Sequence, residues 1–209
     1  MASKAVQMVC LTLGVIGLIG VITCCSLPRW RRTTFKGANA VTAQVIYEGL
    51  WMNCVSQSTG QMQCRAYDSL LALPFQFQAV RAMTVISCIL CGLSLLILLF
   101  GSDLTRCFKN QGTKAEIILV AAVGLLLAGL LVIIPVSWSA HTTIRDFYSP
   151  VFLKFHRREM GVCIYIGWAA GVLLILTGVL LCCFSRPRSS SSSRTVKYRR
   201  ASGLNDDLI

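Results

Sequence analysis

Charged residues are scarce in this chain, and acidic ones above all. They make up 13% of the 209 residues, with only eight Asp or Glu against 20 Lys or Arg. A soluble domain normally carries about 25% charged residues, so this composition excludes an ordinary soluble protein. Four intervals hold no charge at all, and each is long enough for a helix to cross a hydrocarbon core of about 30 Å. They are 5–28, 82–102, 117–144 and 160–185. Because backbone groups in lipid must pair within their own segment, we predict four transmembrane helices.

The residue patterns of most chemistries are also missing. The charge-free intervals offer no proton relay or intramembrane ion site, which argues against a transporter. No nucleophile with a base, phosphate-binding loop or carboxylate pair stands out. The two histidines, His141 and His156, have no CxxC in their own loop that would suggest zinc. We therefore predict that the chain is not an enzyme and binds no cofactor, metal or nucleic acid.

Four spans place both termini on the same side of the membrane. Basic residues do not say which side, because ten lie in the segments on each side, so the positive-inside rule does not orient the chain. Two closely spaced cysteines argue that the first loop is oxidised and extracellular. The predicted segments are a cytoplasmic N-terminus at 1–7, spans at 8–28, 79–101, 116–138 and 160–184, outer loops at 29–78 and 139–159, an inner loop at 102–115, and a disordered cytoplasmic tail at 185–209.

The first outer loop is the only segment large enough to fold by itself. Cys54 and Cys64 flank a turn-prone Ser-Thr-Gly sequence. Pairing two strands across this turn brings the cysteines opposite each other, where a disulfide would fix the register. Two free thiols in a cytosolic loop are the alternative. Strand-like runs occur at 30–35, 40–47, 50–57 and 61–67, which predicts a small antiparallel sheet to which the second outer loop could add an edge strand.

Tryptophans stand near both ends of the first strand pair. Trp30 begins the first run, Gly49 lies between the second and third, and Leu50-Trp51 begins the third. We expect Trp30, Leu50 and Trp51 to form an apolar underside of the sheet at the lipid interface, where indole rings are favoured. The alternative is that the tryptophans are interfacial anchors without a specific fold.

Taken together, these motifs resemble the claudin family. Claudins carry a Trp, a Gly-Leu-Trp and two cysteines in this order in their first extracellular loop, and an arginine at the position of Arg81. The Asp-Phe-Tyr sequence at 146–148 and the Gly-Trp at 167–168 also match, so that the resemblance covers almost the whole chain. Connexins and tetraspanins differ in loop size or cysteine placement. We expect a membrane α+β fold, in which a left-handed four-helix bundle carries a small extracellular antiparallel sheet.

The resemblance implies a structural role at the tight junction of the plasma membrane. Claudins polymerise side by side in one membrane and bind claudins of the neighbouring cell, so the expected partners are further copies, other claudins and membrane lipids. By position, Leu70 would pack beside Phe147, Tyr148 and Met160 of a neighbour, since exposed apolar patches mark interaction surfaces. A dip of Phe147 and Tyr148 into the bilayer is the alternative. The alternative function is a claudin-related protein without strand formation, peripheral-myelin-like or an auxiliary channel subunit.

Basic residues outnumber acidic ones in both outer loops. With Arg81 just beyond it counted in, the first loop region holds six basic residues, Arg31 among them, against two acidic ones, and the second loop holds four against two. We therefore expect a cleft that concentrates anions and repels cations. Arg65 directly follows Cys64, and in the family the residue at this position often sets charge preference. We expect Arg65 to disfavour sodium, in a cation barrier or an anion-selective pore. Arg29 and Arg81 lie near the membrane and are expected to serve structure.

Several candidate sites lie on the inner side. Three cysteines are juxtamembrane and are therefore candidates for palmitoylation: Cys107, Cys182 and Cys183. The alternative is that they only pack against neighbouring side chains. Arg199-Arg200-Ala201-Ser202 resembles a basophilic kinase site, which makes Ser202 a phosphorylation candidate. Many claudins end in Tyr-Val and bind PDZ scaffold proteins, whereas this chain ends in Asp207, Leu208 and Ile209. The apolar terminus could still enter a PDZ groove by strand addition.

Overall fold

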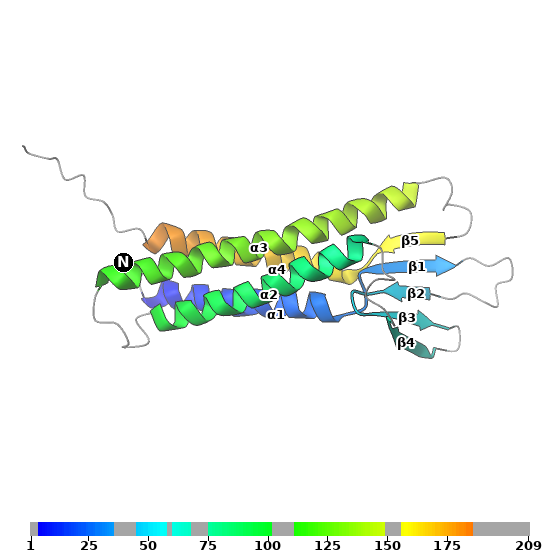
Figure 1. Ribbon diagram of the computed structural model, residues 1–209, viewed down its shortest axis with the longest axis horizontal. Helices are drawn as coiled ribbons and strands as arrows, with labels where there is room; N and C mark the ends of the chain where they lie inside the picture. Colours follow the sequence, from blue (N-terminus) through cyan, green and yellow to red (C-terminus); the bar gives the residue numbers. More distant parts are fainter. Residues whose placement is uncertain are drawn as a thin grey trace, which may run out of the picture.

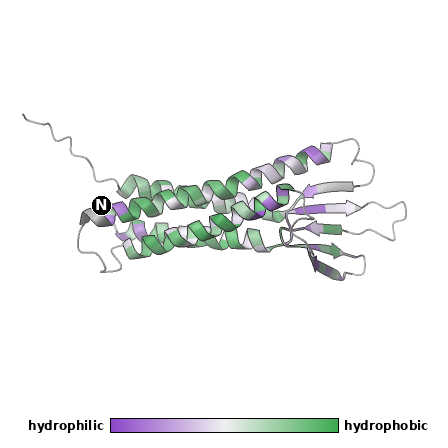
Figure 2. Ribbon diagram, viewed as in Figure 1, coloured by the Kyte–Doolittle hydropathy of each residue, from purple (hydrophilic) through white to green (hydrophobic). Residues whose placement is uncertain are grey.

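Four long helices form a bundle, and a small sheet stands at one end of it (Figure 1). The computed structural model describes residues 4–35, 45–57, 60–67, 75–101, 111–148 and 156–185. The helices are α1 (Lys4–Ser26), α2 (Phe75–Gly101), α3 (Gln111–Tyr148) and α4 (Val162–Ser185). All four are long and apolar enough to cross a membrane, which confirms the predicted number of spanning helices. Hydrophobic residues dominate the bundle, and polar residues gather toward the sheet (Figure 2).

The sheet has five antiparallel strands in the order β4-β3-β2-β1-β5. The strands are β1 (Arg31–Phe35), β2 (Val45–Glu48), β3 (Met52–Ser56), β4 (Met62–Ala66) and β5 (His156–Met160). The first four are shorter than the predicted runs and lie within them, except that β2 extends one residue past its run, to Glu48. The fifth comes from the second outer loop and pairs with β1, so the expected edge strand is confirmed.

Small residues let the helices approach closely. A Cβ on Gly17 of α1 would lie 2.7 Å from Leu174 Cδ2 of α4, and one on Gly129 of α3 would lie 3.0 Å from the carbonyl oxygen of Gly171. The Ser87 hydroxyl of α2 donates a hydrogen bond of 2.8 Å to the Ala128 carbonyl of α3. Such contacts replace the hydrophobic effect as the source of helix association in lipid. The handedness of the bundle stays a prediction.

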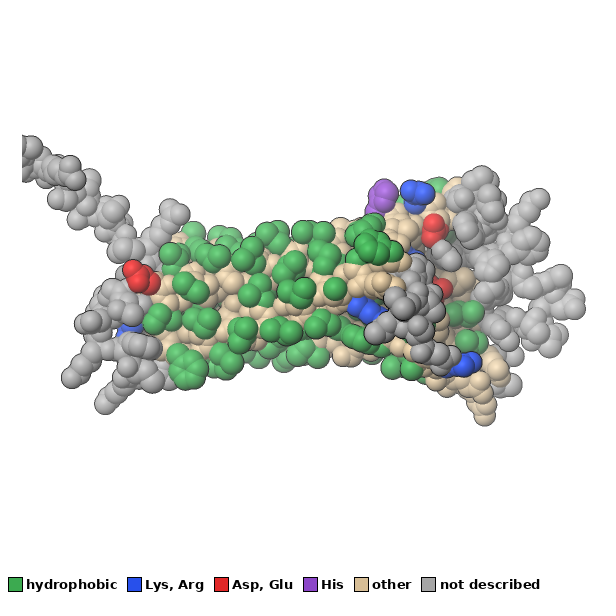
Figure 3. All heavy atoms as spheres, in the orientation of Figure 1, with side chains coloured by type: hydrophobic (Ala, Val, Ile, Leu, Met, Phe, Trp, Pro, Cys, Tyr) green, Lys and Arg blue, Asp and Glu red, His purple; other side chains and the backbone are tan. Residues whose placement is uncertain are grey.

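The outer surface of the bundle is apolar, as lipid contact requires. Large aliphatic side chains on all four helices are exposed, and hydrophobic side chains cover the visible face of the bundle (Figure 3). Examples are Ile16, Ile89, Val120 and Val172.

Helix α3 is longer than the span predicted for it. The predicted span ended at residue 138, but the helix continues with Pro135 inside it to Tyr148. Its 38 residues extend about 57 Å at 1.5 Å per residue, well beyond a core of about 30 Å. The first half of the predicted second outer loop is therefore helical, and α3 diverges from α4 beside the sheet (Figure 1).

Candidate functional interface at the extracellular end

β1 begins at a tightly packed junction, where the sheet meets the ends of the helices. The Trp30 side chain is 1% exposed, and its Nε1 donates a hydrogen bond of 2.8 Å to the Cys24 carbonyl at the end of α1. Leu50 is buried to the same degree, whereas Trp51 is 42% exposed. We expected the side chains of Trp30, Leu50 and Trp51 to face the lipid interface. This expectation is wrong for Trp30 and Leu50. These two side chains belong to the protein core, because the sheet rests directly on the helix ends.

Two glycines, Gly49 and Gly161, allow backbone segments to pass close to each other at this junction. A Cβ on Gly161 would lie 1.8 Å from the Arg29 carbonyl oxygen, and one on Gly49 would lie 2.4 Å from Pro28 Cα. Both distances are below any real Cβ contact, so a larger residue at either position requires the backbone to move. The Gly161 N–H also donates to the Trp30 carbonyl at 3.0 Å. This bond ties the start of α4 to the start of β1.

Arg81 joins helix α2 to the sheet. Its side chain is 6% exposed, and its Nε donates a hydrogen bond to the Leu50 carbonyl. The guanidinium carbon lies 4.9 Å from the ring centroid of Trp51 and 5.4 Å from that of Tyr67. A buried charge needs such compensation. These contacts agree with the structural role expected for Arg81.

Tyr67 connects β4 to the same junction between the sheet and the helix ends. Its hydroxyl lies within hydrogen-bond distance of Asn53 Oδ1 and, at 3.2 Å, of the Gly49 carbonyl. Burial raises the pKa of Tyr67, and nearby Glu48 raises it further, while Arg81 acts in the opposite direction. The phenol is thereby held in its neutral, hydrogen-bonding form.

Arg31 does not face the cleft. Its side chain is 6% exposed, with the guanidinium carbon 4.8 Å from the ring centroid of Phe77 in α2. The register partner of Arg31 on β2 is Glu48. The expectation that this arginine contributes to the charge of the intercellular cleft is therefore wrong, because its side chain is buried against Phe77 of α2.

The Cys54–Cys64 disulfide is present, between directly opposed positions of β3 and β4. The two Cα atoms are 4.0 Å apart, and Gly60 supplies the turn with a φ of 79°. Every residue of β4 is exposed, including Arg65. The disulfide therefore fixes the register of an edge strand that presents Arg65 to solvent.

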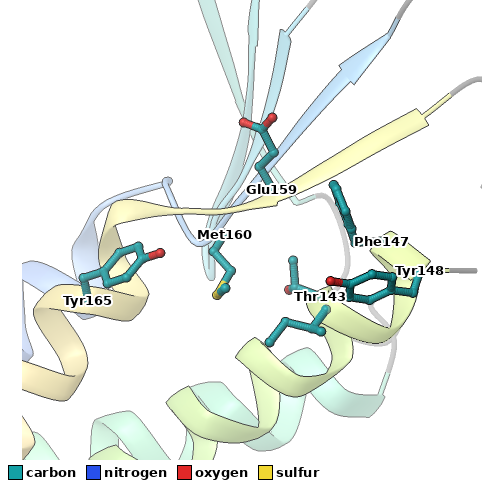
Figure 4. A pocket seen from close by; sticks show the side chains of 7 residues that line it. Thr143, Phe147, Tyr148, Glu159, Met160 and Tyr165 are labelled. Atoms are coloured by element: carbon teal, nitrogen blue, oxygen red, sulfur yellow. The ribbon is translucent and has the colours of Figure 1, made fainter. Parts of the chain in front are cut away.

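A pocket of about 470 Å³ opens where α3 leaves α4, next to β5. Figure 4 places Phe147 and Tyr148 on α3, Met160 and Glu159 on β5, and Tyr165 on α4 around it. The rings of Phe147 and Tyr148 meet edge to face with centroids 5.5 Å apart. The structure thus gathers three of the four residues predicted for the contact between neighbours. The fourth, Leu70, lies outside the described residues.

The remaining predicted sites are on the inner side. Cys182 is half-buried and Cys183 exposed at the end of α4. Cys107, Ser202 and the terminal Asp207, Leu208 and Ile209 lie outside the described residues, as does the predicted disordered tail beyond Ser185. Among the residues that the structure describes, no His, Cys, Asp or Glu side chains cluster in a way that would hold a metal ion.

Comparison with known proteins agrees with these features. The model of the PMP-22/EMP/MP20/Claudin family matches residues 4–181. Claudin-4 of Homo sapiens is 53% identical over 201 residues, which cover 96% of each chain. Claudin-3 of Mus musculus is 51% identical over 187 residues, 90% of this chain and 85% of that protein.

The chain belongs to the claudin family. With four membrane-spanning helices and claudins as relatives, it is a multi-pass plasma-membrane protein of the tight junction.

Three residues of this claudin site were missed by sequence reasoning. Tyr67 was visible only as an aromatic at the end of a strand run. Gly161 carries no local signal, because its partner Arg29 is far away in the sequence. Arg31 was misread because a charged residue in a loop is normally solvated. A general rule that arginines pair with aromatic rings would not have selected Phe77.

Proposed function

We propose that this claudin polymerises into tight-junction strands and limits cation passage between cells through the positive charge of its extracellular sheet. The observation that carries the proposal is the position of Arg65. It is exposed on edge strand β4, directly after a cysteine of the disulfide. A charge held at a fixed place on an exposed strand acts on ions in a narrow cleft more strongly than one on a free loop.

Fewer arginines can act on ions in the cleft than the sequence suggests. Arg31 and Arg81 are buried, and the exposed Arg29 lies over the ring of Tyr47 at 5.8 Å. Arg32 and Arg65 are exposed. The register aligns Arg65 with Asn53, Glu48 and Arg31, so that Arg32 faces the opposite side of the sheet. Arg65 is therefore the exposed basic residue of its face among the described residues of β1 to β4.

Charge reversal at Arg65 tests this role. Two unit charges about 8 Å apart in water have an interaction energy of about 0.5 kcal/mol, and salt screening reduces this energy by roughly a factor of three. Reversing one charge changes the energies of sodium and chloride in opposite directions, so Arg65→Asp should shift the chloride-to-sodium permeability ratio roughly threefold toward sodium. Dilution potentials across a monolayer measure this ratio.

The matched control is Arg32→Asp, which makes the same charge change on the opposite face of the sheet. It should shift the ratio less. An unchanged ratio in Arg65→Asp, with normal delivery to the junction, would rule Arg65 out as the selectivity residue. A shift with low total conductance would indicate a barrier, and one with high chloride conductance an anion-selective pore.

The pocket beside β5 supports side-by-side association. It is lined by Phe147, Tyr148 and Met160, and exposed Tyr148 extends this apolar surface. We propose that Leu70 of a neighbouring copy packs there. Freeze-fracture of cells that lack other claudins tests polymerisation itself. Continuous strands support it, whereas scattered particles would indicate a claudin-related protein without strand formation, and the family model also covers peripheral myelin proteins.

Three further proposals concern the inner side. Exposed Cys183 and half-buried Cys182 are accessible enough for palmitoylation. Binding of PDZ scaffold proteins through Ile209 and phosphorylation of Ser202 rest on the sequence. Peptides with and without Ile209 that bind PDZ domains equally poorly would remove the scaffold proposal.

A further inference from the structure

The disulfide orients the protein in the membrane. The Cys54–Cys64 bond lies in the sheet, and such bonds persist in the oxidising environment outside the cell. Helix α1 begins and helix α4 ends at the opposite end of the bundle (Figure 1), so we expect that end at the cytoplasmic face. The cytoplasmic leaflet contains anionic lipids and has a negative surface potential. Basic side chains at the headgroup level of this end are therefore attracted to the membrane surface.

Helix packing places the start of α1 level with the end of α4. A Cβ on Gly14 of α1 would lie 3.8 Å from Thr177 Cγ2 of α4, so these two positions are at the same level in the bundle. Lys4, the first residue of α1, lies ten residues before Gly14, and Ser185, the last residue of α4, lies eight residues after Thr177. At 1.5 Å per residue the two helix ends differ in level by about 3 Å. The chain therefore leaves α4 beside Lys4.

Lipid-facing apolar side chains continue almost to this level. Phe184, one residue before the end of α4, is 47% exposed, and Phe100, one residue before the end of α2, is 55% exposed. On α1, Met8 is 46% exposed and lies one turn after Lys4, whose side chain is also exposed. Exposed apolar side chains at these helix ends suit contact with hydrocarbon, and Lys4 lies beyond them. Lys4 is therefore at the level of the lipid headgroups.

The sequence that follows α4 is strongly basic. Arg186 comes two residues after Phe184, within about 7 Å along an extended chain. No acidic residue occurs between Phe184 and Asp206, and residues 102–116 at the same end hold two acidic residues against three basic ones, so they do not cancel this charge. Six basic residues fall within the 15 positions 186–200: Arg186, Arg188, Arg194, Lys197, Arg199 and Arg200.

We infer that this end of the claudin binds the anionic headgroups of phospholipids through Lys4 and the basic residues at 186–200. Four to eight Lys or Arg directly cytoplasmic of a membrane-spanning helix are the pattern that attracts such lipids. The binding is electrostatic, so it requires negative charge on the lipid rather than one particular headgroup. It is independent of the proposed polymerisation and of Arg65, which lie at the other end of the molecule.

Spin-labelled lipids measure this binding in the membrane. The full-length chain is reconstituted into phosphatidylcholine bilayers with a trace of spin-labelled phosphatidylserine or phosphatidylcholine, and electron spin resonance gives the fraction of each label restricted at the protein. We expect phosphatidylserine to associate about fivefold more strongly at low salt, the effect of one basic residue at a lipid surface. In 1 M salt the Debye length falls to about 3 Å, so this preference should disappear. Equal association of both lipids at low salt would overturn the inference and leave the basic residues to an acidic protein partner.

Removal of positive charge locates the binding. The triple variant Lys4→Gln, Arg186→Gln and Arg188→Gln should lower the preference for phosphatidylserine to below about twofold. The matched control makes the same charge change with three exposed basic residues of the sheet end, and it should keep the fivefold preference. Its substitutions are Arg29→Gln, Arg32→Gln and Arg65→Gln. An equal loss of preference in both triple variants would overturn the assignment to the end opposite the sheet.

Addition of negative charge gives an independent test outside the helices and the sheet. Ser190→Asp, Ser191→Asp and Ser192→Asp place three carboxylates between Arg188 and Arg194 and should lower the preference to a similar degree, whereas alanine at the same three positions should leave it unchanged. A preference that survives both the glutamine and the aspartate substitutions would overturn the inference, because the anionic lipid would then be bound elsewhere on the protein.

Discussion

The helix bundle and the extracellular sheet of this claudin are stabilised in different ways. In the bundle, glycine, serine and alanine let backbones approach each other, and the spanning interiors contain no charge. The sheet is small and polar and carries a disulfide between β3 and β4, and its junction with the bundle contains two buried arginines and a buried tryptophan. Lipid contact excludes charge from the bundle, whereas the sheet lacks a core of its own and must anchor itself to the helix ends. The junction is therefore where single substitutions should have the largest effects.

The largest expected effect follows from Gly161→Ala. The added Cβ would lie 1.8 Å from the Arg29 carbonyl oxygen, so the crossing of β1 and α4 must open, at a cost of about 3 kcal/mol or more. We expect a large loss of thermal stability in detergent-purified protein and little delivery to the cell surface. Gly92→Ala in α2 is the control, because its Cβ meets nothing within 4 Å. That substitution should be neutral or raise stability by about 0.5–1 kcal/mol. Equal stability of the two variants would contradict the importance of the junction.

Much of this difference could be predicted from the sequence. Charge-free intervals indicated the four helices because lipid leaves the backbone no alternative to helix. The four strand runs and the cysteine pair were also predictable, since both follow from local residue patterns. The continuation of α3 to Tyr148 was not, because the polar residues after Trp138 suggest a loop, and β5, which packs against α3, comes from a later segment of the chain. The burial of Arg31 depends on Phe77, a contact between distant segments that no local pattern encodes.

A smaller and more local effect is expected from removal of the disulfide. Closing the short loop between Cys54 and Cys64 stabilises the hairpin by about 2–3 kcal/mol in the chain-entropy model. Cys54→Ala or Cys64→Ala should therefore make the β3–β4 hairpin sensitive to trypsin at Arg65 and remove the paracellular effect, while helix content by far-ultraviolet circular dichroism stays unchanged. Cys88→Ala, which removes a half-buried free thiol of α2, is the control and should leave the hairpin and the paracellular effect intact. Normal tightness with intact strands in either disulfide variant would show that the sheet does not depend on this bond.

The smallest expected effect concerns Tyr67, and it distinguishes a polar anchor from an apolar one. Tyr67→Phe keeps the ring beside Arg81 but removes the hydroxyl that contacts Asn53 and the Gly49 carbonyl, so stability at neutral pH should fall by about 1 kcal/mol. Burial raises the pKa of Tyr67 in the folded protein above the usual value of about 10. Between these two pKa values the unfolded chain releases the phenolic proton and the folded chain keeps it, so the wild type loses stability as pH rises above about 10. Phenylalanine cannot titrate, so the difference between the two proteins should shrink with rising pH. Thermal unfolding at pH 8 and above pH 10 measures this convergence. Equal stability of the two proteins at pH 8 would mean that the hydroxyl contributes nothing and that the ring alone anchors β4 to the bundle. A constant difference at both pH values would mean that folding does not raise the pKa of Tyr67.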